Sequence, residues 1–552
     1  MSKLPSTGIF IIVLTTLCIC FGPASSSASG LEGTVIQYLE LGPAKHLKVD
    51  AHGMTAAEID ERIIRIYREH DFQPFWIGNG TPSHRAIVVR SVLENADRHG
   101  LNPASYLVGN IQQFWGNTDA PGLVQLDILI TLGMMLYVAD QREGRIAPFL
   151  ANPELFATAR DVKVDWNGVR EQALKAPDMQ IFLEQQAPPY FQYRQLLNKL
   201  TEYRQIAVNG GWPSIPVGPT LKPGMQDSRV PSIRRRLSIT GELVAAALDN
   251  PLFDADLEAA VRQFQKRHNL GQDGVIGQQT LAALNVPVSS RIVQIIINME
   301  RYRWMNRVLD ERGVFVNIAG FEAFAGEPGN MEIEMPVIVG KTYHETPVFS
   351  DTIKYIVINP YWNLTPSIAY NETLPKLKAD SHYLEKHNMR IFEGWGENAP
   401  EIDPTAIDWS TVSRQQMNRY RVRQDPGPEN ALGTLKLVFP NKYNVYLHDT
   451  PAHDLFTRDR RAFSHGCIRM GRPAEMAAFV LGGKENGWTV ERIEEIVKSQ
   501  KRQVVKLEKT MPVHILYRTA YINPADNSLY FFEDIYGRDK ILAAALFNTA
   551  KR

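Results

Sequence analysis

The sequence predicts a multi-domain α+β protein, in which a helical first half precedes a small three-helix module and a mostly-β domain. Three observations support this prediction. The length of 552 residues exceeds what one hydrophobic core supports. Apolar residues recur with helical spacing in the first part of the chain, and short runs rich in β-branched and aromatic residues begin after Gly313. Sixty acidic and sixty basic side chains cancel, so the composition gives no reason to expect a nucleic-acid partner.

Residues 1–29 have the pattern of a secretory signal peptide. A positive start and an apolar core at residues 9–21 are followed by small residues, with cleavage expected after Ala28. The apolar core is short for a membrane span, and an uncleaved anchor is the alternative. Because Cys18 and Cys20 lie in this segment, the exported chain would keep one thiol, which fits a bacterial periplasmic protein without structural disulfides.

Residues 30–220 are expected to form a helical scaffold domain. Ile59, Ile63 and Tyr67 recur with the 3.6-residue period of one helix face. Residues 124–139 are strongly apolar, which predicts a buried helix. No group of residues in this region has the pattern of a catalytic site, so we expect a structural role.

Residues 221–288 are expected to form a compact module of three short helices, joined by tight Asp-Gly and Ile-Gly turns. The stretches Ala-Val-Arg-Gln-Phe-Gln at 260–265 and Asp-Gly-Val-Ile-Gly-Gln-Gln-Thr at 273–280 resemble the three-helix peptidoglycan-binding domain. That family more often has Pro at the position of Gln278. The resemblance implies a cell-wall partner. The three arginines at 234–236 are expected on a solvated face.

A mostly-β domain is expected over residues 313–505, after a connecting helix over 289–312. Strands are predicted at 314–318, 332–339, 353–359, 435–439 and 443–449. Residues 364–430 make a connection that is long for two strands of one sheet, and we expect a helical lid there, with helix over 372–386 and loop elsewhere. The C-terminal segment, residues 506–552, is expected to pack on the scaffold domain.

A single thiol distinguishes this β domain. Cys467 lies in Ser-His-Gly-Cys-Ile-Arg at 464–469, and a lone thiol cannot form an internal disulfide. An imidazole can take the S–H proton and give a reactive thiolate, so Cys467 is the candidate nucleophile and His448 the candidate base. Because side chains alternate along a strand, Tyr446 and His448 should face away from the core. The following loop should return Cys467 to hydrogen-bond distance of His448.

The residues around the thiol have expected roles of their own. The backbone N–H groups of Gly466 and Cys467 are candidates for binding the negative oxygen that develops in acyl transfer. His465 would line the pocket, and Ser464 would orient a neighbouring group or cap the turn. Arg469 would bind a substrate carboxylate or form a structural salt bridge.

The ring of His448, two aromatic residues and the possibility of a bound metal need separate expectations. Either Asp449 or a backbone carbonyl would orient its ring. Tyr446 and Trp362 are additional candidates for substrate contacts. A zinc site made from the thiol and the two histidines is the alternative interpretation, but a paired Cys-x-x-Cys is missing from the sequence. We therefore expect no metal here, and the family resemblance described next implies that no cofactor is needed.

His448, followed after fifteen residues by the motif at 464–469, resembles the signature of the L,D-transpeptidase catalytic domain of the YkuD type. Three further stretches resemble the long, multi-domain Gram-negative subtype of that family: 359–363, 426–433 and 439–443. That subtype also has a scaffold domain, a peptidoglycan-binding domain and a lid. The resemblance implies that Cys467 is the nucleophile and His448 the general base, and that His465 and Gly466 line the acyl pocket.

The resemblance also implies a reaction. Such enzymes attack a peptidoglycan tetrapeptide stem, release D-Ala and pass the acyl group to the diamino-acid side chain of a second stem, which gives a 3→3 cross-link. Carbapenems acylate the family, and cell-wall synthases are expected partners. Transfer to water, as in an L,D-carboxypeptidase, or to a lysine of an outer-membrane protein would use the same thioester. An alternative of another class is a non-catalytic peptidoglycan-binding protein that relies on residues 226–288.

Overall fold

The computed structural model describes residues 30–47, 49, 54–148, 163–305, 307, 312–327, 329–396, 398–524 and 526–548. The expected signal peptide at 1–29 lies outside the described residues. The chain divides into two compact units. The first unit comprises Met1–Glu94, Pro103–Met135 and Trp166–Gln180, and the second comprises Asn95–Asn102, Leu136–Asp165 and Ile181–Arg552.

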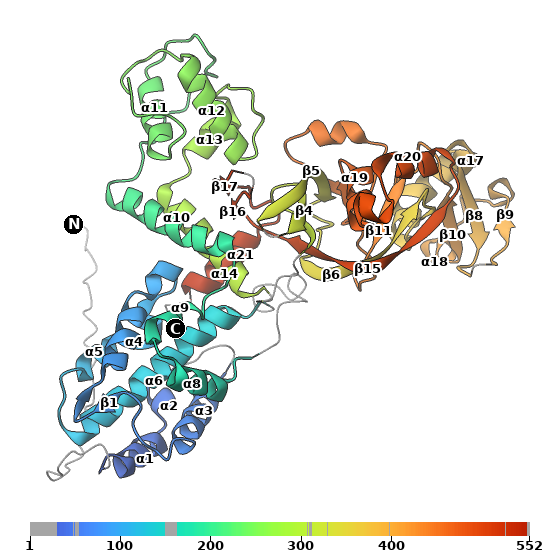
Figure 1. Cartoon of the computed structure of the whole chain (residues 1–552). Coiled ribbons are helices and arrows are strands. Elements are labelled where there is room, and N and C mark those ends of the chain that lie inside the picture. The colour runs from blue at the N-terminus through green and yellow to red at the C-terminus, as the bar shows by residue number, and fades with distance from the viewer. Residues whose placement is uncertain are drawn as a thin grey trace, which may run out of the picture. The chain divides into compact units, whose positions relative to one another are not determined.

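The first unit is built from helices (Figure 1). They are α1 (Glu32–Glu40), α2 (Pro43–His46), α3 (Ala56–Arg68), α4 (His84–Glu94), α5 (Val108–Phe114), α8 (Trp166–Lys175) and the first part of α6 (Ala120–Glu143), with a short hairpin of β1 (Ile77–Gly78) and β2 (Thr81–Pro82). A reciprocal capping box between Thr55 and Glu58 starts α3. By length and composition α6 could span a membrane, but 94% of its apolar window is buried inside the protein, as predicted for 124–139.

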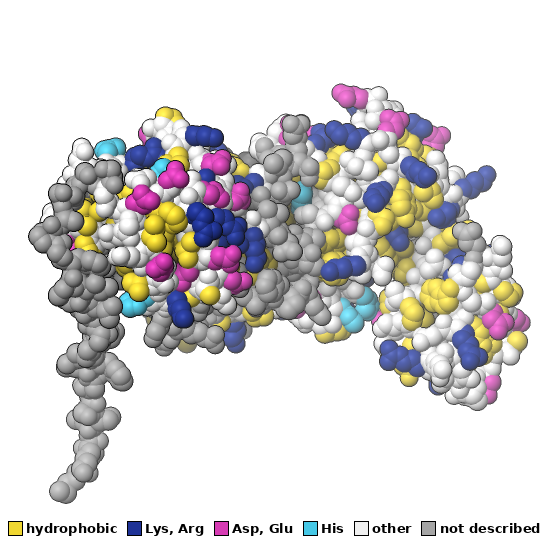
Figure 2. All heavy atoms as spheres, turned by 90° about the horizontal axis from the view of Figure 1, so that it is seen from below, with side chains coloured by type: hydrophobic (Ala, Val, Ile, Leu, Met, Phe, Trp, Pro, Cys, Tyr) yellow, Lys and Arg dark blue, Asp and Glu magenta, His cyan; other side chains and the backbone are white. Residues whose placement is uncertain are grey.

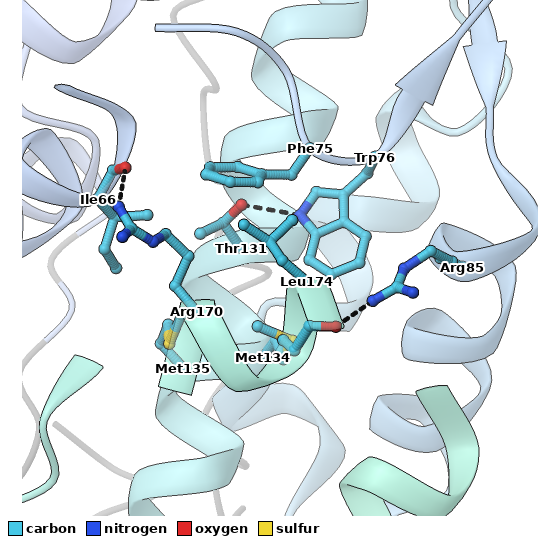
Figure 3. Close-up of a pocket in the computed structure, with 10 residues that line it drawn as sticks. Ile66, Phe75, Trp76, Arg85, Thr131, Met134, Met135, Arg170 and Leu174 are labelled. Atoms are coloured by element: carbon cyan, nitrogen blue, oxygen red, sulfur yellow. Dashed lines mark hydrogen bonds between the residues drawn. The ribbon is translucent and has the colours of Figure 1, made fainter. Parts of the chain in front are cut away.

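A buried carboxylate organises the centre of the first unit. Asp127 accepts hydrogen bonds from the Tyr67 hydroxyl at 2.6 Å and from the N–H groups of Trp76 and Phe75 at 2.7 and 3.1 Å. Burial raises the pKa of Asp127 to about 6. The pocket in Figure 3 is lined by Ile66, Phe75, Trp76, Arg85, Thr131, Met134, Met135, Arg170, Ala173 and Leu174. Its lining holds no cysteine, histidine or acidic side chain, which fits a structural role.

The three-helix module follows in the second unit. Its helices are α11 (Val230–Ile239), α12 (Ala255–Arg267) and α13 (Gln278–Leu284), and they enclose one hydrophobic core. The prediction that the three-arginine run is solvated is wrong for two of its members, because Arg234 and Arg236 are buried. Arg236 donates to the Leu284 carbonyl at 3.0 Å and lies 3.8 Å from the ring centre of Trp212. Carbonyl and aromatic partners thus replace water around these guanidinium groups.

Two long helices of the second unit receive the C-terminal segment. α10 (Phe191–Val208) and α14 (Val288–Arg303) pack on each other and on the hairpin of β16 (Ala520–Ile522) and β17 (Leu529–Phe531). The last described helix, α21 (Arg538–Asn548), packs on α14 through Leu542 and Ile297. The described part of the C-terminal segment is therefore integrated into the second unit.

A nine-stranded sheet forms the mostly-β domain, in the order β13-β5-β14-β12-β11-β6-β15-β3-β4. The strands are β3 (Gly313–Asn317), β4 (Glu322–Glu327), β5 (Asn330–Gly340), β6 (Phe349–Ile358), β11 (Leu435–Val438), β12 (Leu447–His448), β13 (Ala462–Ser464), β14 (Ile468–Met470) and β15 (Gln503–Leu516). Because β4 also pairs with β5, the strands from β5 through β15 to β4 form a closed ring. β15 pairs with β6 and β3, so the sheet extends past the predicted boundary at 505. The helices α19 (Pro473–Val480) and α20 (Val490–Lys498) contribute to its core (Figure 1).

The lid is more regular than predicted. It contains the helices α15 (Pro366–Ile368), α16 (Leu374–Ala379), α17 (Tyr383–Lys386) and α18 (Arg414–Met417), a π-helical turn η4 (Ala369–Thr373), and a sheet in the order β7-β10-β8-β9. Those strands are β7 (Trp362–Asn363), β8 (Met389–Glu393), β9 (Glu401–Ile402) and β10 (Tyr420–Gln424). The prediction of loop outside 372–386 is therefore wrong. Arginines interrupt the apolar pattern of β8 and β10, and Arg421 and Arg423 stack on Phe392 across the two strands.

Candidate active site

Strand register places the predicted nucleophile and base on one face of the sheet. β12 and β14 are parallel, with Leu447 opposite Ile468. Both of these side chains are buried in the hydrophobic core. Alternation along the strands therefore turns Tyr446, His448 and Cys467 toward the opposite face. This pairing agrees with the prediction that the His448 side chain faces away from the core.

Cys467 is half-buried and carries a protonated thiol at neutral pH. Its S–H group lies 3.7 Å from the Asn444 carbonyl oxygen, and Tyr446 also hydrogen-bonds to the sulfur. Burial raises the pKa of the Cys467 thiol, while the Tyr446 hydrogen bonds and the charges of Lys436 and Arg469 oppose that rise. The resting sulfur needs a base before it can attack.

His448 is the candidate base. It is buried and uncharged, so it can accept a proton, but the burial that lowers its pKa also makes it a weaker base than a free imidazole. Burial lowers the pKa of His448 to about 3, and the charge of Arg469 adds to the effect. Nδ1 donates to the backbone carbonyl of Asp449 at 2.5 Å, so the carbonyl orients the ring and the carboxylate does not. That carboxylate instead accepts hydrogen bonds from Thr434. In the neutral ring the proton on Nδ1 leaves Nε2 as the basic nitrogen.

No hydrogen bond joins Cys467 to His448 in the described part of the chain, which differs from the direct contact that we expected. Tyr446 contacts both residues: it hydrogen-bonds to the thiol, and its ring centre lies 5.6 Å from that of His448. Catalytic hydrogen bonds in unliganded enzymes are often formed only when substrate binds. Proton transfer here requires a side-chain movement on the shared face.

The turn before the nucleophile leaves one N–H group available. Ser464 accepts a hydrogen bond from the Gly466 N–H at 3.1 Å and donates one to the Cys467 carbonyl at 2.5 Å. Gly466 has a φ of 109°, which a side chain would strain. The Gly466 N–H is thus already used, whereas the Cys467 N–H has no acceptor among the described residues. Of the two predicted oxyanion donors, the Cys467 N–H is the one that remains free.

His465 connects the nucleophile turn to the lid. Its Nε2 lies 2.7 Å from the Glu372 carboxylate in η4, and its ring centre lies 5.1 Å from that of His344. Burial lowers the pKa of His465, and Glu372 opposes that shift. The predicted pocket residue therefore lies at the point where the lid meets the turn.

Two cations share the face of the sheet with the thiol. Lys436 of β11 pairs with His448 in the strand register, and its Nζ lies 3.6 Å from the ring centre of Tyr446. Arg469 donates weakly to Thr450 at 3.5 Å, and its buried Nε has no hydrogen-bond partner. No carboxylate forms an ion pair with Arg469 within the described ranges, so its guanidinium is available to an anionic ligand.

Trp362 has a different environment from the other candidates. It lies in β7, opposite Gln424, and packs against the hydrophobic core of the lid. No contact among the described residues joins it to Cys467 or His448. Across the same described residues, no three His, Cys, Asp or Glu side chains are grouped as a bound metal would require.

Sequence reasoning missed three residues of this site. Lys436 interrupts the apolar Leu-Lys-Leu sequence at 435–437, and that interruption is a signal that could have identified it. Glu372 and Thr346, which contact the nucleophile turn, lie far from it in the sequence and carry no such signal.

Acidic and basic side chains both occur over the face of the molecule in Figure 2, in keeping with their equal numbers.

Comparisons with known families divide the chain into three matched regions. Residues 311–514 match the L,D-transpeptidase catalytic domain, YkuD. Residues 61–200 match a scaffold domain, and residues 226–284 match a family described as "Putative peptidoglycan binding domain". The matches agree with the fold class and the domain types that the sequence predicts.

A curated relative from Haemophilus influenzae, named "Putative L,D-transpeptidase", is 34% identical over 285 residues. The alignment covers 51% of this chain and 56% of the relative. A solved L,D-transpeptidase structure from Xylanimonas cellulosilytica is 14% identical, with coverage of 55% of this chain and 99% of that chain and a TM-score of 0.17. A fused Zn-dependent amidase/peptidase/peptidoglycan-binding domain-containing protein from Clostridium acetobutylicum is 14% identical, with coverage of 54% and 100% and a TM-score of 0.14.

Proposed function

We propose that this chain, whose regions match the YkuD L,D-transpeptidase catalytic domain, a scaffold domain and a peptidoglycan-binding domain, is a periplasmic enzyme that forms 3→3 cross-links in peptidoglycan. The observation that carries the proposal is the common face of Cys467, His448 and Tyr446 beside a free Cys467 N–H group. The export pattern at residues 1–29 supports the periplasmic location, and a cleaved signal is part of the proposal.

The first half of the reaction makes a thioester. His448 Nε2 takes the thiol proton as the Cys467 sulfur attacks the carbonyl carbon between the diamino acid and D-Ala of a tetrapeptide stem. The carbonyl oxygen becomes negative and accepts a hydrogen bond from the Cys467 N–H. When the C–N bond breaks, protonated His448 gives its proton to the departing D-Ala amine. The acyl group remains on sulfur, and His448 is neutral again.

The second half transfers the acyl group. The side-chain amine of a diamino acid in a second stem attacks the thioester carbonyl, and His448 accepts a proton from that amine. The C–S bond breaks, and the sulfur recovers its proton from His448. Arg469, whose guanidinium has no carboxylate partner among the described residues, is suited to hold a stem carboxylate during these steps.

Other acceptors use the same thioester. Water would give an L,D-carboxypeptidase, and a lysine of an outer-membrane protein would give a protein-to-wall attachment. We favour the amine of a second stem, because a peptidoglycan-binding domain keeps stems close and so raises the local concentration of that acceptor. Carbapenems are expected to acylate Cys467, and cell-wall synthases are the expected partners.

The test uses purified residues 30–552 and a disaccharide-tetrapeptide, with products weighed by mass spectrometry. A dimer that has lost D-Ala supports the transpeptidase, and a tripeptide alone indicates the carboxypeptidase. The Cys467→Ala variant should give neither product and no carbapenem adduct, while its unfolding midpoint in urea stays close to that of the native chain. An adduct on Cys467→Ala would refute the assignment of the nucleophile.

A further inference from the structure

The Gly466 carbonyl, directly before the nucleophile, has a fixed partner from another strand connection. The hydroxyl of Thr346 donates a hydrogen bond to this carbonyl oxygen at 2.9 Å. The same hydroxyl accepts the Gly340 N–H at 2.9 Å, so both of its hydrogen-bonding roles are used. Thr346 is fully buried, and water cannot replace these bonds.

This bond fixes the direction of the free N–H group. The Gly466 carbonyl and the Cys467 N–H belong to one peptide unit, which is planar and trans, so the two bonds point in opposite directions. A carbonyl held toward Thr346 therefore turns the Cys467 N–H away from Thr346. Gly466 has a φ of 109° and no side chain to restrain its rotation. Ser464 binds the groups on either side of this peptide unit, and Thr346 binds the unit itself.

Thr346 is in turn held by the C-terminal segment. Arg538 donates to the Thr346 carbonyl at 3.0 Å, and the Thr346 N–H lies 3.3 Å from the Tyr536 hydroxyl. The Tyr536 hydroxyl also donates to the Gly340 carbonyl at 2.6 Å. Arg538 pairs with Glu345 at 2.7 Å. The N–H and the carbonyl of Thr346 are thus both hydrogen-bonded to the C-terminal segment, through Tyr536 and Arg538.

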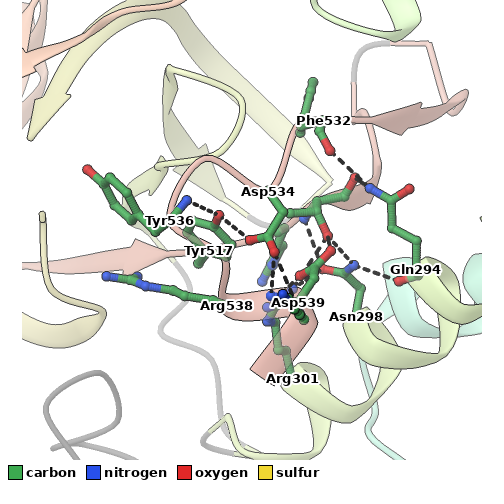
Figure 4. A network of polar contacts seen from close by, with 12 residues as sticks. Gln294, Asn298, Arg301, Tyr517, Phe532, Asp534, Tyr536, Arg538 and Asp539 are labelled. Carbon is green, nitrogen blue, oxygen red and sulfur yellow. Dashed lines mark hydrogen bonds and ion pairs between the residues drawn. The ribbon is translucent and has the colours of Figure 1, made fainter. Parts of the chain in front are cut away.

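The segment that provides these groups is anchored on α14, as Figure 4 shows. Arg301 pairs with Asp539 at 2.7 Å, and Asn298 donates to Thr519 at 2.8 Å. Asp534 accepts the Tyr517 hydroxyl at 2.7 Å. These residues lie in α14 or after residue 516, and those after 516 lie outside the stretch that matches the catalytic family, which ends at residue 514.

We propose that Thr346, with Tyr536 and Arg538 behind it, is a positioning residue that aims the Cys467 N–H at the oxyanion, which makes the C-terminal segment a working part of the active site. The proposal rests on the proposed function for its natural substrate. The orientation of the Gly466–Cys467 peptide unit by Thr346 should affect the reaction of Cys467 with any acyl donor.

The test separates acylation from alkylation of the same sulfur. Acylation by a carbapenem or by p-nitrophenyl acetate passes through an oxyanion, whereas alkylation by iodoacetamide does not. Thr346→Val keeps the shape of the side chain and removes the hydroxyl. We expect its acylation rates to fall at least about tenfold while alkylation stays within about twofold, since misplacing one oxyanion donor affects only the oxyanion step. Thr346→Ser should restore acylation.

Matched variants exclude a loss of folding as the cause. Thr131→Val removes a buried hydroxyl from the first unit and should change neither rate. Tyr536→Phe should repeat the selective loss in weaker form, with kcat lowered and KM unchanged for the tetrapeptide. An equal ratio of acylation to alkylation in Thr346→Val and the native chain would overturn the proposal. Absence of cross-linked and tripeptide products with the native chain would instead refute the proposed function, and the ester assay would still decide the positioning role.

Discussion

The Glu372 carboxylate lies 2.7 Å from Nε2 of His465, two residues before the nucleophile. Glu372 belongs to the π-helical turn of the lid, and such turns occur frequently at functional sites. Both side chains are partly exposed, so this pair contributes on the order of 0.2–1 kcal/mol. Because that energy is small, we expect the lid to separate from the turn often, and the effect of losing the pair should be measurable.

Replacing Glu372 should expose the thiol to large reagents. In Glu372→Gln the charge is lost, and we expect a bulky maleimide to label Cys467 about two- to fivefold faster, in line with the energy of an exposed ion pair. The labelling rate is followed by mass spectrometry under excess reagent. The control is Glu385→Gln, because Glu385 pairs with His382 at 3.3 Å in the same lid without a contact to the turn. Equal acceleration in both variants would contradict a specific role for Glu372.

The reactivity of Cys467 should keep rising with pH. Burial raises the pKa of the thiol above its ordinary value and lowers the pKa of His448 to about 3, so neither group is charged near pH 7. Iodoacetamide alkylation should increase about tenfold per pH unit from pH 6 to 8, without a plateau below the ordinary cysteine pKa of about 8.5. The rates are measured by stopped sampling and mass spectrometry. A plateau with a midpoint near pH 6 would instead indicate a resting thiolate–imidazolium pair.

Lys436 should support the thiolate through its charge. Its Nζ lies 3.6 Å from the Tyr446 ring centre, and its charge opposes the burial that raises the pKa of Cys467. Lys436→Met keeps the length of the chain and removes the charge, and should slow alkylation at pH 7.5 by a factor of about 3–10. Lys442→Met is the control, because Lys442 also lies over a tyrosine ring, at 5.1 Å, but carries an exposed side chain. A rate unchanged by Lys436→Met would remove the electrostatic role.

Gly433 should be essential for the position of His448. It has a φ of 61°, and an added Cβ would clash with the carboxylate of Asp449, whose carbonyl orients His448. Gly433→Ala should lower the free energy of unfolding by about 2–4 kcal/mol, from backbone strain plus a steric clash. Gly483→Ala has a similar φ of 64° but no atom within 4 Å, and should cost only about 1 kcal/mol. Urea titration gives both values, and equal losses would contradict the clash.

Features that depend on a local sequence pattern could be predicted from the sequence. Alternation along 443–448 predicted the face of His448, and the strand register agrees with it. The nucleophile role of Cys467 in the motif at 464–469 stays a prediction. The fold class is confirmed by the matched families. Lys436 shares the face of the thiol only because β11 pairs with β12, and strand pairing is not encoded in a local period.

Longer-range contacts explain what the sequence could not predict. Thr346 reaches Gly466 across 120 residues, and Arg267 reaches the Leu529 carbonyl across 262. The prediction that the arginine run is solvated fails for a related reason. Arg236 is buried because the Leu284 carbonyl accepts its hydrogen bond and the Trp212 indole packs against its guanidinium, and both lie far from it in the sequence. The expected hydrogen bond between Cys467 and His448 depends on side-chain rotation, which strand alternation does not determine.

The place of β15 in the ring has a consequence for biosynthesis. It is the last of the nine strands along the chain, yet it lies between β6 and β3, which were made well over a hundred residues earlier. Until residue 516 has been synthesised, those two strands present unpaired edges to the surroundings. The nascent polypeptide must therefore stay soluble with an open ring of strands, so ribosome-bound intermediates are natural clients for chaperones that shield strand edges.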